Sequence, residues 1–470
     1  MSQITFYGGA GTVTGSKYLI EHNGRRVLVD SGLFQGLAEL RELNWQPPPF
    51  DPTSIDAVVL THAHIDHTGY LPKLVKSGFA GPVITSKPTA DLLRILLPDS
   101  ARLQEEEADY RNRHNLTSHT PALPLYDEAD AREALERIQT VANDGQPHQV
   151  ADGITASFLV AGHIMGASLV LLELTNTKEV TDGYKTTRLL FSGDLGHYDQ
   201  PILKDPVAPP NCDYLVCEST YGDRLHGDDS PADQLARIIN EAVERRGPIL
   251  IPAFAVGRTQ EVLYTIRELE EQHRIPILPV VVDSPMAAQA TQVYNRFHEE
   301  HDEEYASILA GKRHPLRTAS MTTASSRDES KRINNMHGSR IIISASGMMT
   351  GGRVLHHAIR ILPDPKATVV FVGFQAAGTR GRLIQDGIRE IKIMRNMVRV
   401  RCHVEKVEGF SAHADWQGIL RWLGGLQSPP KRLFLTHGEV EASTALAEKI
   451  RERFHWTVEI PTHGETFELV

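Results

Sequence analysis

The chain has 470 residues, of which 41% are hydrophobic, and it carries a formal net charge of −10. This length predicts two domains, because a single hydrophobic core rarely grows so large. The acidic balance argues against a general nucleic-acid binder with a basic surface, so a polyanion would have to meet a local positive site, which bound metal ions can supply.

The first third of the chain has the pattern of short β segments between glycine-rich turns. We expect strands at residues 4–6, 18–20, 27–30, 57–61, 82–85, 156–161, 169–174, 189–192 and 215–217. Residues 91–141 instead show a helical pattern rich in Glu, Ala, Arg and Leu. Three cysteines, Cys212, Cys217 and Cys402, are too few for a disulfide framework and not spaced like a zinc site, which favours core positions in a reducing compartment.

From about residue 230 to 375, strands and helices alternate. A helix should begin at Ser230-Pro231, and strands should follow at 249–254, 278–283, 340–344 and 368–374, which predicts a parallel α/β unit. The tail returns to β character at 398–407 and 433–436, with a helical pattern at 415–423 between them. We therefore expect residues 221–397 to form a domain inserted between two parts of another, 1–220 and 398–470.

No stretch approaches the length of a membrane span, and the first residues lack the charged and apolar regions of a signal peptide. These features predict a cytoplasmic protein without a membrane partner. The chain also lacks a GxGxxG turn and a GxxxxGK[ST] loop, so we expect no nucleotide cofactor.

The densest motif follows the apolar stretch 57–60 and reads Thr-His-Ala-His-Ile-Asp-His, residues 61–67. It places three imidazoles and a carboxylate within six residues, a set that suits zinc and its neighbours. His62 and His64 can face one metal, and Asp66 and His67 can face a second. The alternative is a polar loop with surface histidines, which such crowding after a strand makes improbable.

Three further candidates, His163, Asp194 and His437, each follow a β-like run directly. Ligands gather at the carboxyl ends of strands in α/β sheets, so we expect one shared site, although each histidine alone reads equally well as a hydrogen-bonded core residue. We assign His62, His64 and His163 to one metal. Asp66, His67 and His437 are assigned to a second, with Asp194 between the two. Asp30 is expected to orient a ligand imidazole, or else to cap its own turn.

The order Asp30, His62-x-His64-x-Asp66-His67, His163, Asp194 resembles the metallo-β-lactamase superfamily. Glu218 in Cys-Glu-Ser-Thr-Tyr-Gly, His413 in Ser-Ala-His-Ala-Asp and His437 in Thr-His-Gly-Glu resemble the three additional motifs of its β-CASP group. The resemblance implies an α/β protein, an αββα sandwich with an inserted α/β β-CASP domain. The group includes ribonucleases and the endonuclease subunit that cleaves mRNA 3′ ends.

The resemblance further implies a dizinc hydrolase, with manganese as the alternative ion, in which a metal-bound hydroxide cleaves single-stranded RNA to 5′-phosphate and 3′-hydroxyl ends. Asp66, Glu218 and His413 would be catalytic, with His413 as proton donor or, alternatively, a cap on the helix near residue 415. Endonuclease action is expected, 5′-exonuclease action stays open, and dimers are common among relatives. The competing interpretations are a DNA nuclease or other hydrolase on this fold, and a non-catalytic RNA-processing scaffold.

The glycine- and hydroxyl-rich run 344–353 precedes a helical pattern at 354–362. Backbone amides at a helix start bind anions, and the resemblance favours phosphate contact by Ser346 and Gly347 over a plain strand-to-helix turn. Further RNA-backbone contacts are expected from residues that could equally be ordinary surface or turn residues: Ser411, Arg258, Arg353, Arg380 and Arg382.

Overall fold

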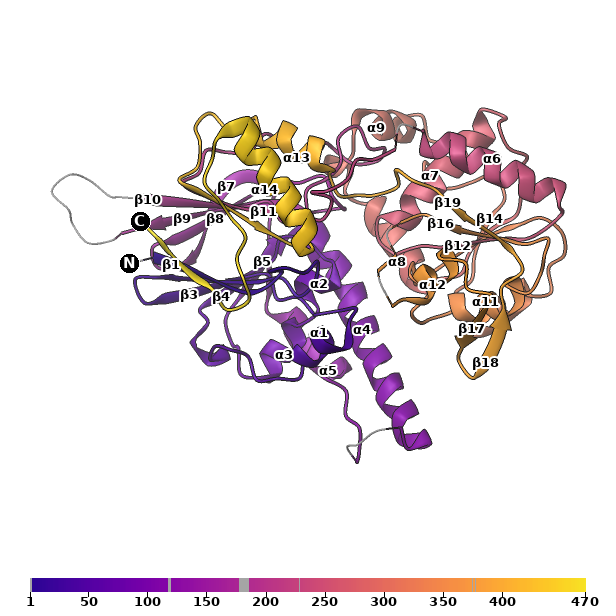
Figure 1. Cartoon of the computed structure of the whole chain (residues 1–470), viewed down its shortest axis with the longest axis horizontal. Coiled ribbons are helices and arrows are strands. Elements are labelled where there is room, and N and C mark those ends of the chain that lie inside the picture. Colours follow the sequence, from indigo (N-terminus) through magenta and orange to yellow (C-terminus); the bar gives the residue numbers. More distant parts are fainter. Residues whose placement is uncertain (1, 117–119, 177–185, 228, 374, 377) are drawn as a thin grey trace. The chain divides into compact units, whose positions relative to one another are not determined.

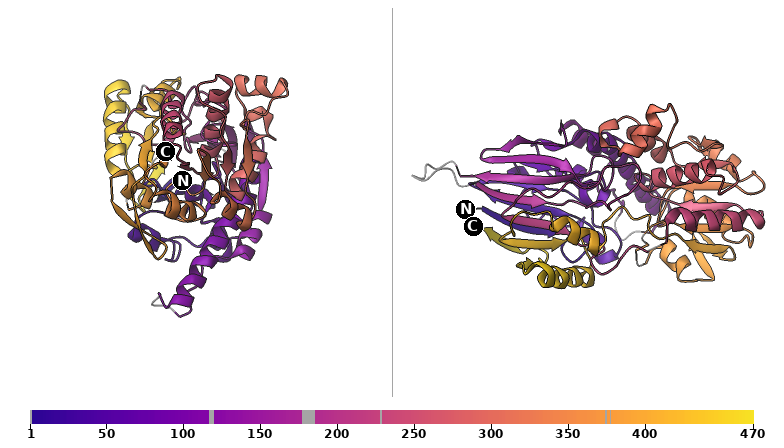
Figure 2. Two further views of the ribbon diagram at one scale, coloured as in Figure 1. Left: turned by 90° about the vertical axis from the view of Figure 1, so that its right-hand side faces the viewer. Right: turned by 90° about the horizontal axis from the view of Figure 1, so that it is seen from above.

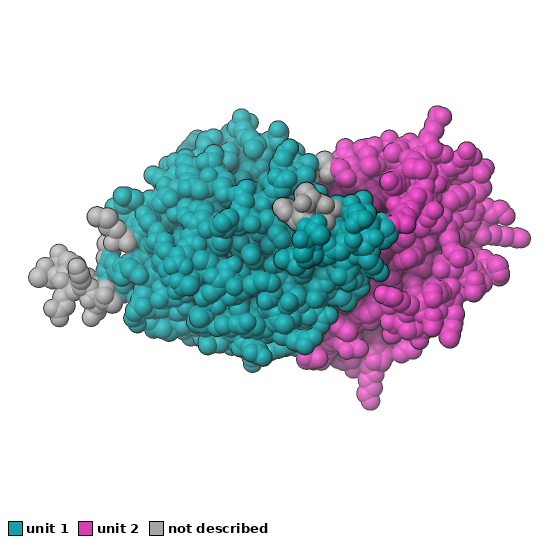
Figure 3. Space-filling view, turned by 90° about the horizontal axis from the view of Figure 1, so that it is seen from below, with its two compact units in different colours: residues 1–199, 205–225, 413–470 teal, residues 200–204, 226–412 magenta. Residues whose placement is uncertain are grey.

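The computed structural model describes residues 2–116, 120–176, 186–227, 229–373, 375–376 and 378–470. The chain divides into two units (Figure 3). Unit 1 comprises residues 1–199, 205–225 and 413–470, and unit 2 comprises residues 200–204 and 226–412. The predicted division at 397/398 falls inside a strand of unit 2, described below.

Two seven-stranded sheets form the centre of unit 1 (Figure 1). The first has the order β22 (Thr466–Leu469), β1 (Ser2–Gly8), β2 (Lys17–His22), β3 (Arg25–Val29), β4 (Ala57–Val59), β5 (Val83–Ser86) and β6 (Ile138–Val141). The second has the order β21 (Val458–Glu459), β20 (Arg432–Thr436), β11 (Tyr214–Glu218), β10 (Thr186–Phe191), β9 (Ser168–Thr175), β8 (Ile154–Val160) and β7 (Asp144–Ala151).

The two sheets pack face to face through apolar side chains from both. The Phe6 ring lies 5.2 Å from that of Phe434, and the Tyr18 ring lies 5.7 Å from that of Phe191. Burying one such side chain stabilises the fold by about 1.5–3 kcal/mol. The first and last strands, β1 and β22, pair with each other, so the final segment completes the sheet that the first segment begins.

Helices cover the outer faces of both sheets, giving the expected αββα sandwich (Figures 1 and 2). On the first sheet these are α1 (Ala38–Leu43), α2 (Ile65–Thr68), α3 (Leu71–Lys76), α4 (Lys87–His114) and α5 (Glu128–Glu136). On the second they are α13 (Trp416–Leu423) and α14 (Val440–Phe454). The helical pattern at 91–141 thus contains two helices and ends in β6. A short 3₁₀ turn, Pro52–Ser54, precedes β4.

Unit 2 contains a six-stranded sheet whose pairings are all parallel. Its order is β14 (Met321–Thr323), β13 (Val280–Val282), β15 (Ile341–Ser344), β12 (Ile249–Pro252), β16 (Thr368–Phe371) and β19 (His403–Lys406). Ile249 and Ile251 belong to one buried cluster and Leu250 to another. Since neighbouring side chains of a strand point to opposite faces, both faces of this sheet are covered, as in a parallel α/β sheet.

The helices of unit 2 are α6 (Pro231–Glu244), α7 (Arg258–Glu271), α8 (Pro285–Tyr294), α9 (Glu303–Ala310), α10 (Arg327–Ile333), α11 (Val354–Ile361) and α12 (Arg380–Gln385), with a 3₁₀ turn at His298–Glu300. A hairpin of β17 (Glu390–Ile393) and β18 (Asn396–Arg399) follows α12. The β-rich run expected at 398–407 is therefore two strands, β18 and β19, and both pair within unit 2. Phe374, at the end of one expected strand, lies outside the described residues.

The cysteines are free, and Cys212 and Cys217 are buried. Among the described helices, none is both long enough and apolar enough to cross a bilayer.

Candidate metal centre

Strand direction brings the candidate ligands of unit 1 to one edge of its sheets. β10, β11 and β20 run parallel as neighbours, and they end just before Asp194, at Glu218 and just before His437. β3 and β4 are likewise parallel, and they lead into Asp30 and the 61–67 motif. The carboxyl ends of parallel neighbours meet at the same edge, which explains how Asp66 and His437, 371 positions apart, come into contact.

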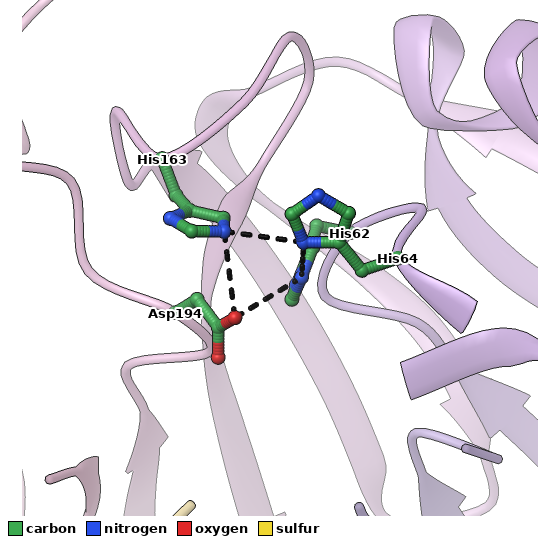
Figure 4. A group of neighbouring side chains, drawn as sticks. All are labelled: His62, His64, His163 and Asp194. Atoms are coloured by element: carbon green, nitrogen blue, oxygen red, sulfur yellow. Dashed lines mark hydrogen bonds and ion pairs between the residues drawn. The ribbon is translucent and has the colours of Figure 1, made fainter. Parts of the chain in front are cut away.

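The first ligand group contains His62, His64, His163 and Asp194 (Figure 4). The Nδ1 atom of His64 lies 3.1 Å from His62 Nε2 and 3.2 Å from His163 Nε2. Asp194 Oδ2 lies 3.4 Å from each of those Nε2 atoms. Ligands about 2.0–2.1 Å from one zinc ion stand about 3.3 Å apart in a tetrahedron, so this spacing fits a zinc site.

The protonation state of these histidines also suits a metal. Burial, and next the neighbouring His67, lower the pKa of His62 to about 3. Burial lowers the pKa of His64 to about 4, and it holds the pKa of His163 well below its usual value. These imidazoles are therefore neutral at pH 7, which is the form that binds a metal ion.

The second ligand group contains Asp66, His67 and His437. His437 Nε2 lies 3.3 Å from Asp66 Oδ2, and His67 Nε2 lies 3.2 Å from Asp194 Oδ1. Although His67 Nε2 and Asp194 Oδ1 lie close together, both are buried and neither makes a well-aligned hydrogen bond with a described residue. A buried polar atom without a hydrogen bond lowers the stability of the fold by about 1–3 kcal/mol, and a cation bound between these atoms would remove that loss. Asp194 thus presents one oxygen to each group.

Hydrogen bonds behind the ligands fix which nitrogen faces the site. Asp30 Oδ2 accepts from His67 Nδ1 at 2.7 Å, while Asp30 Oδ1 accepts from the amide of Thr61 at 2.8 Å. Thr220 Oγ1 donates to the carbonyl of His437 and accepts from its Nδ1 at 3.0 Å. With Nδ1 protonated in both rings, Nε2 is the nitrogen of His67 and of His437 that is left for a metal ion. Asp30 thus contacts a distant loop rather than its own turn.

Glu218 and His413 form a pair beside the ligands. His413 Nδ1 lies 3.0 and 3.1 Å from the two carboxylate oxygens of Glu218, and 3.9 Å from Asp194 Oδ2. The amide of Leu195 donates to Glu218 Oε1 at 2.6 Å and fixes the carboxylate. Burial acts to lower the pKa of His413, but the carboxylates of Glu218 and Asp194 raise this pKa to about 9.

The predicted substrate contacts lie in unit 2. Arg353 donates to Asp283 at 2.7 Å and to the carbonyls of Ala324 and Ser325, so three of its hydrogen bonds stay within the unit. Arg258 pairs with Glu261.

In the run 344–353, the hydroxyls of Ser346 and Thr350 lie 2.9 Å apart. A side chain at Gly347 would meet Phe254 at 3.0 Å. Ser411 is buried. For these residues the phosphate contact stays a prediction.

Sequence reasoning did not single out Thr220 or Thr61, which hydrogen-bond the ligands His437 and His62. Both lie just past the end of a strand, Thr61 at the start of the 61–67 motif and Thr220 two residues after Glu218, and that position is the signal that could have identified them. It also missed Lys17, which is 5% exposed and lies 4.6 Å from the centres of the Phe34 and Tyr70 rings. Lysine so deeply buried without a carboxylate leaves no trace in a sequence pattern.

Three families match successive parts of this chain. The metallo-beta-lactamase superfamily matches residues 10–154, the Beta-Casp domain matches 259–384, and the Zn-dependent metallo-hydrolase RNA specificity domain matches 397–461. The fold and site therefore define a metallo-hydrolase with an inserted Beta-Casp domain.

Whole-chain comparisons agree. Ribonuclease TTHA0252 of Thermus thermophilus is 36% identical over 96% of both chains, and an RNase J-like protein of Methanocaldococcus jannaschii is 31% identical over 98% of this chain and 97% of that one. Transcription termination factor FttA of Pyrococcus horikoshii is 30% identical over 99% of this chain and 71% of that one. The chain belongs to the β-CASP ribonucleases of the metallo-β-lactamase superfamily, which confirms the resemblance seen in its motifs.

A solved structure shares the fold alone. The crystal structure of a protein of unknown function from Enterococcus faecalis V583 aligns with 99% of both chains, at 16% identity and a TM-score of 0.53.

Proposed function

We propose that this protein hydrolyses phosphodiester bonds of single-stranded RNA at a dizinc site in unit 1, leaving 5′-phosphate and 3′-hydroxyl ends. The observation that carries the proposal is the pair of ligand groups sharing Asp194, with the Glu218–His413 pair beside them. The names of the matched relatives and of the matched RNA specificity domain support RNA as substrate.

His62, His64 and His163 would hold one zinc ion, Asp66, His67 and His437 the other, and Asp194 both. Two bound zinc ions supply a nucleophilic water at neutral pH and neutralise charge on the phosphate oxygens. With Asp194 shared, each ion would have four protein ligands, so the number of ligands does not separate a catalytic centre from structural zinc. A structural site has no use for the Glu218–His413 pair beside the ligands, and we therefore favour a catalytic centre over a scaffold with structural zinc.

The chain's own residues would then manage the proton. With Nδ1 held by Glu218, His413 can donate a proton from Nε2 to the leaving oxygen. Its raised pKa keeps the ring protonated at neutral pH, as a general acid requires. Asp66 stands in the proposed catalytic set as well, since it contacts His437 and would hold the second ion together with it. Because water attacks rather than the ribose 2′-hydroxyl, the phosphate stays on the 5′ end.

In unit 2, Ser346, Gly347, Ser411, Arg258 and Arg353 remain the proposed contacts to the RNA backbone. Arg353 would have to hold a phosphate with donors that Asp283 does not use, since its Nη1 is already bonded there. Zinc with manganese as the alternative ion, endonuclease action with 5′-exonuclease action left open, a homodimer and the lack of a nucleotide cofactor also belong to this proposal.

The test is incubation of end-labelled single-stranded RNA with the zinc-loaded protein, with and without a chelator, followed by end-group analysis. Metal-dependent products with 5′-phosphate ends are expected. Cleavage of DNA of the same sequence at an equal rate would favour the DNA nuclease, and no metal-dependent cleavage of RNA would remove the proposal.

A further inference from the structure

One segment of unit 2 is positively charged, although the chain as a whole is negatively charged. Residues 380–401 contain seven Lys and Arg against two Asp and Glu, a net charge of +5 in a chain of net charge −10. The segment comprises α12 and the β17–β18 hairpin, which lies at the lower edge of the orange part of Figure 1. Such a local concentration can attract a polyanion even though the whole protein is acidic.

The hairpin presents its charges on one side. Ile391, Ile393 and Val398 are buried in an apolar cluster of unit 2, which anchors the inner side. Lys392 is paired in register with Met397, and both are exposed on the other side. Alternation along the strands keeps these sets apart, so the outer side carries Lys392 and Arg399 against one carboxylate, Glu390, and the buried side supports it.

Four cations of the segment are not neutralised. Arg382 pairs with Asp386 and Arg399 pairs with Glu390, while Arg380 bonds backbone carbonyls. The remaining four are exposed and have neither an ion pair nor a side-chain hydrogen bond to any described residue: Arg389, Lys392, Arg395 and Arg401. The amide of Val400 donates to the carbonyl of Arg389 at 2.8 Å, which brings Arg401 close to Arg389.

We propose that the β17–β18 hairpin of unit 2 is a second RNA-binding site, which docks the phosphate backbone of single-stranded RNA. This inference rests on the proposed function, which makes RNA the substrate. Four unpaired cations complement phosphates, and binding them releases counterions. Met394 and Met397 are 42% and 63% exposed beside these cations, and their polarisable side chains can pack against base faces. Single strands expose those faces, whereas a duplex stacks them.

The experiment measures binding without catalysis. A fluorescent single-stranded RNA of about forty nucleotides is titrated with the full-length protein in EDTA, at several salt concentrations between about 50 and 200 mM. The hairpin variant carries Arg389→Gln, Lys392→Gln and Arg395→Gln. The matched control carries Lys312→Gln, Arg313→Gln and Arg317→Gln, which remove the same charge from exposed positions elsewhere in unit 2.

Each phosphate contact in a single strand contributes about −0.7 to the slope of log K against log salt. The slope measured for the hairpin variant should therefore be less steep than the wild-type slope by about 2, and its affinity at about 0.1 M salt should be at least about tenfold lower. The control variant should keep the wild-type slope. The single change Arg395→Glu, in the exposed turn, should weaken binding in the same direction.

Wild-type affinity and slope in the hairpin variant would overturn the inference, as would an equal loss in the control. A duplex of the same sequence bound as tightly as the single strand would overturn it too. The inference would also be overturned if polyglutamate bound to the hairpin while RNA binding did not depend on the hairpin, because the hairpin would then be a site for an acidic protein. If RNA binding depends on the hairpin but no metal-dependent cleavage occurs, the proposed function is contradicted and this site is supported. If RNA is cleaved but its binding does not depend on the hairpin, the proposed function is supported and this site is contradicted.

Discussion

His67 and Asp30 are joined by a 2.7 Å hydrogen bond between two buried side chains that are 37 residues apart in the chain. The bond orients the imidazole so that Nε2 faces the second ligand group. Although burial opposes a charged ring, the carboxylates of Asp194 and Asp30 raise the pKa of His67 above its usual value. A metal ion at this site would therefore displace a proton as it binds, and Asp30 would keep the ring in place.

Asp30→Asn should weaken zinc binding about 10- to 100-fold, because the amide cannot match the carboxylate in holding the His67 ring. Competition with a chromophoric chelator measures the affinity. Asp152→Asn is the control, since that carboxylate is 76% exposed and lies away from the ligands. Unchanged affinity in Asp30→Asn would contradict the orienting role.

His413→Ala should keep nearly the full metal content and slow RNA cleavage by about 10²–10⁴-fold, the usual loss when a general acid is removed. Asp194→Ala should instead lose metal from both groups, because its two oxygens face one group each. Metal analysis beside single-turnover rates separates the two effects. An emptied site in His413→Ala would show that this histidine is a ligand rather than a proton donor.

Glu218→Gln should slow cleavage in the same way as His413→Ala, since both oxygens of Glu218 lie within 3.1 Å of His413 Nδ1. Residues that act as a unit are not additive, so the double variant should be no slower than His413→Ala alone. Rates of both single variants and the double variant give the test. Losses that multiply would mean that Glu218 acts independently of His413.

Lys17→Met should change how stability depends on pH. Burial lowers the pKa of Lys17 to about 7, whereas an unfolded lysine titrates near 10.4. Between these values the unfolded chain binds a proton that the folded chain does not, so wild-type stability should rise from pH 7 to about pH 10, by up to about 4 kcal/mol. The Met variant lacks this gain.

Thermal midpoints of both proteins at pH 7 and at about pH 10 measure the difference. The advantage of Lys17→Met at neutral pH should shrink in alkali. A constant difference between the two proteins would mean that Lys17 stays charged, held by the carbonyls of Gly32 and Gly15 and by the two aromatic rings.

Gly32→Ala should disturb the second ligand group, because a Cβ there would lie 1.6 Å from the carbonyl oxygen of Asp66. The backbone carrying Asp66 must then move, which should cost about 1–3 kcal/mol of stability and weaken zinc binding. Gly351→Ala is the control, since its Cβ would meet nothing within 4 Å. Thermal unfolding and zinc titration are the readouts, and equal effects at both positions would contradict the argument.

The residues that the structure gathers into the two candidate ligand groups are visible in the sequence because they are concentrated at strand ends. Residues 62–67 are neighbours in the chain, and His163, Asp194 and His437 each follow an apolar run. The features that the sequence could not show depend on contacts between residues far apart in the chain. The parallel register of β19 with β16 assigns the run after 400 to unit 2, and nothing local marks that choice. The Arg353–Asp283 bond likewise joins positions 70 residues apart, so the local pattern, from which we expected an RNA contact, could not show it.

In the proposed dizinc centre, Asp194 would couple the binding of one ion to the binding of the other. Its Oδ2 atom lies among the histidines of one group and its Oδ1 atom beside His67 of the other. An ion bound to one oxygen immobilises the Asp194 side chain, so a second ion at the other oxygen costs less conformational entropy. The first ion also withdraws negative charge from the carboxylate, which opposes this gain. The affinities of the two positions are therefore linked, and linkage is reciprocal: occupancy of either position alters the other by one common factor. Zinc uptake by this protein should accordingly depart from the isotherm of two independent sites.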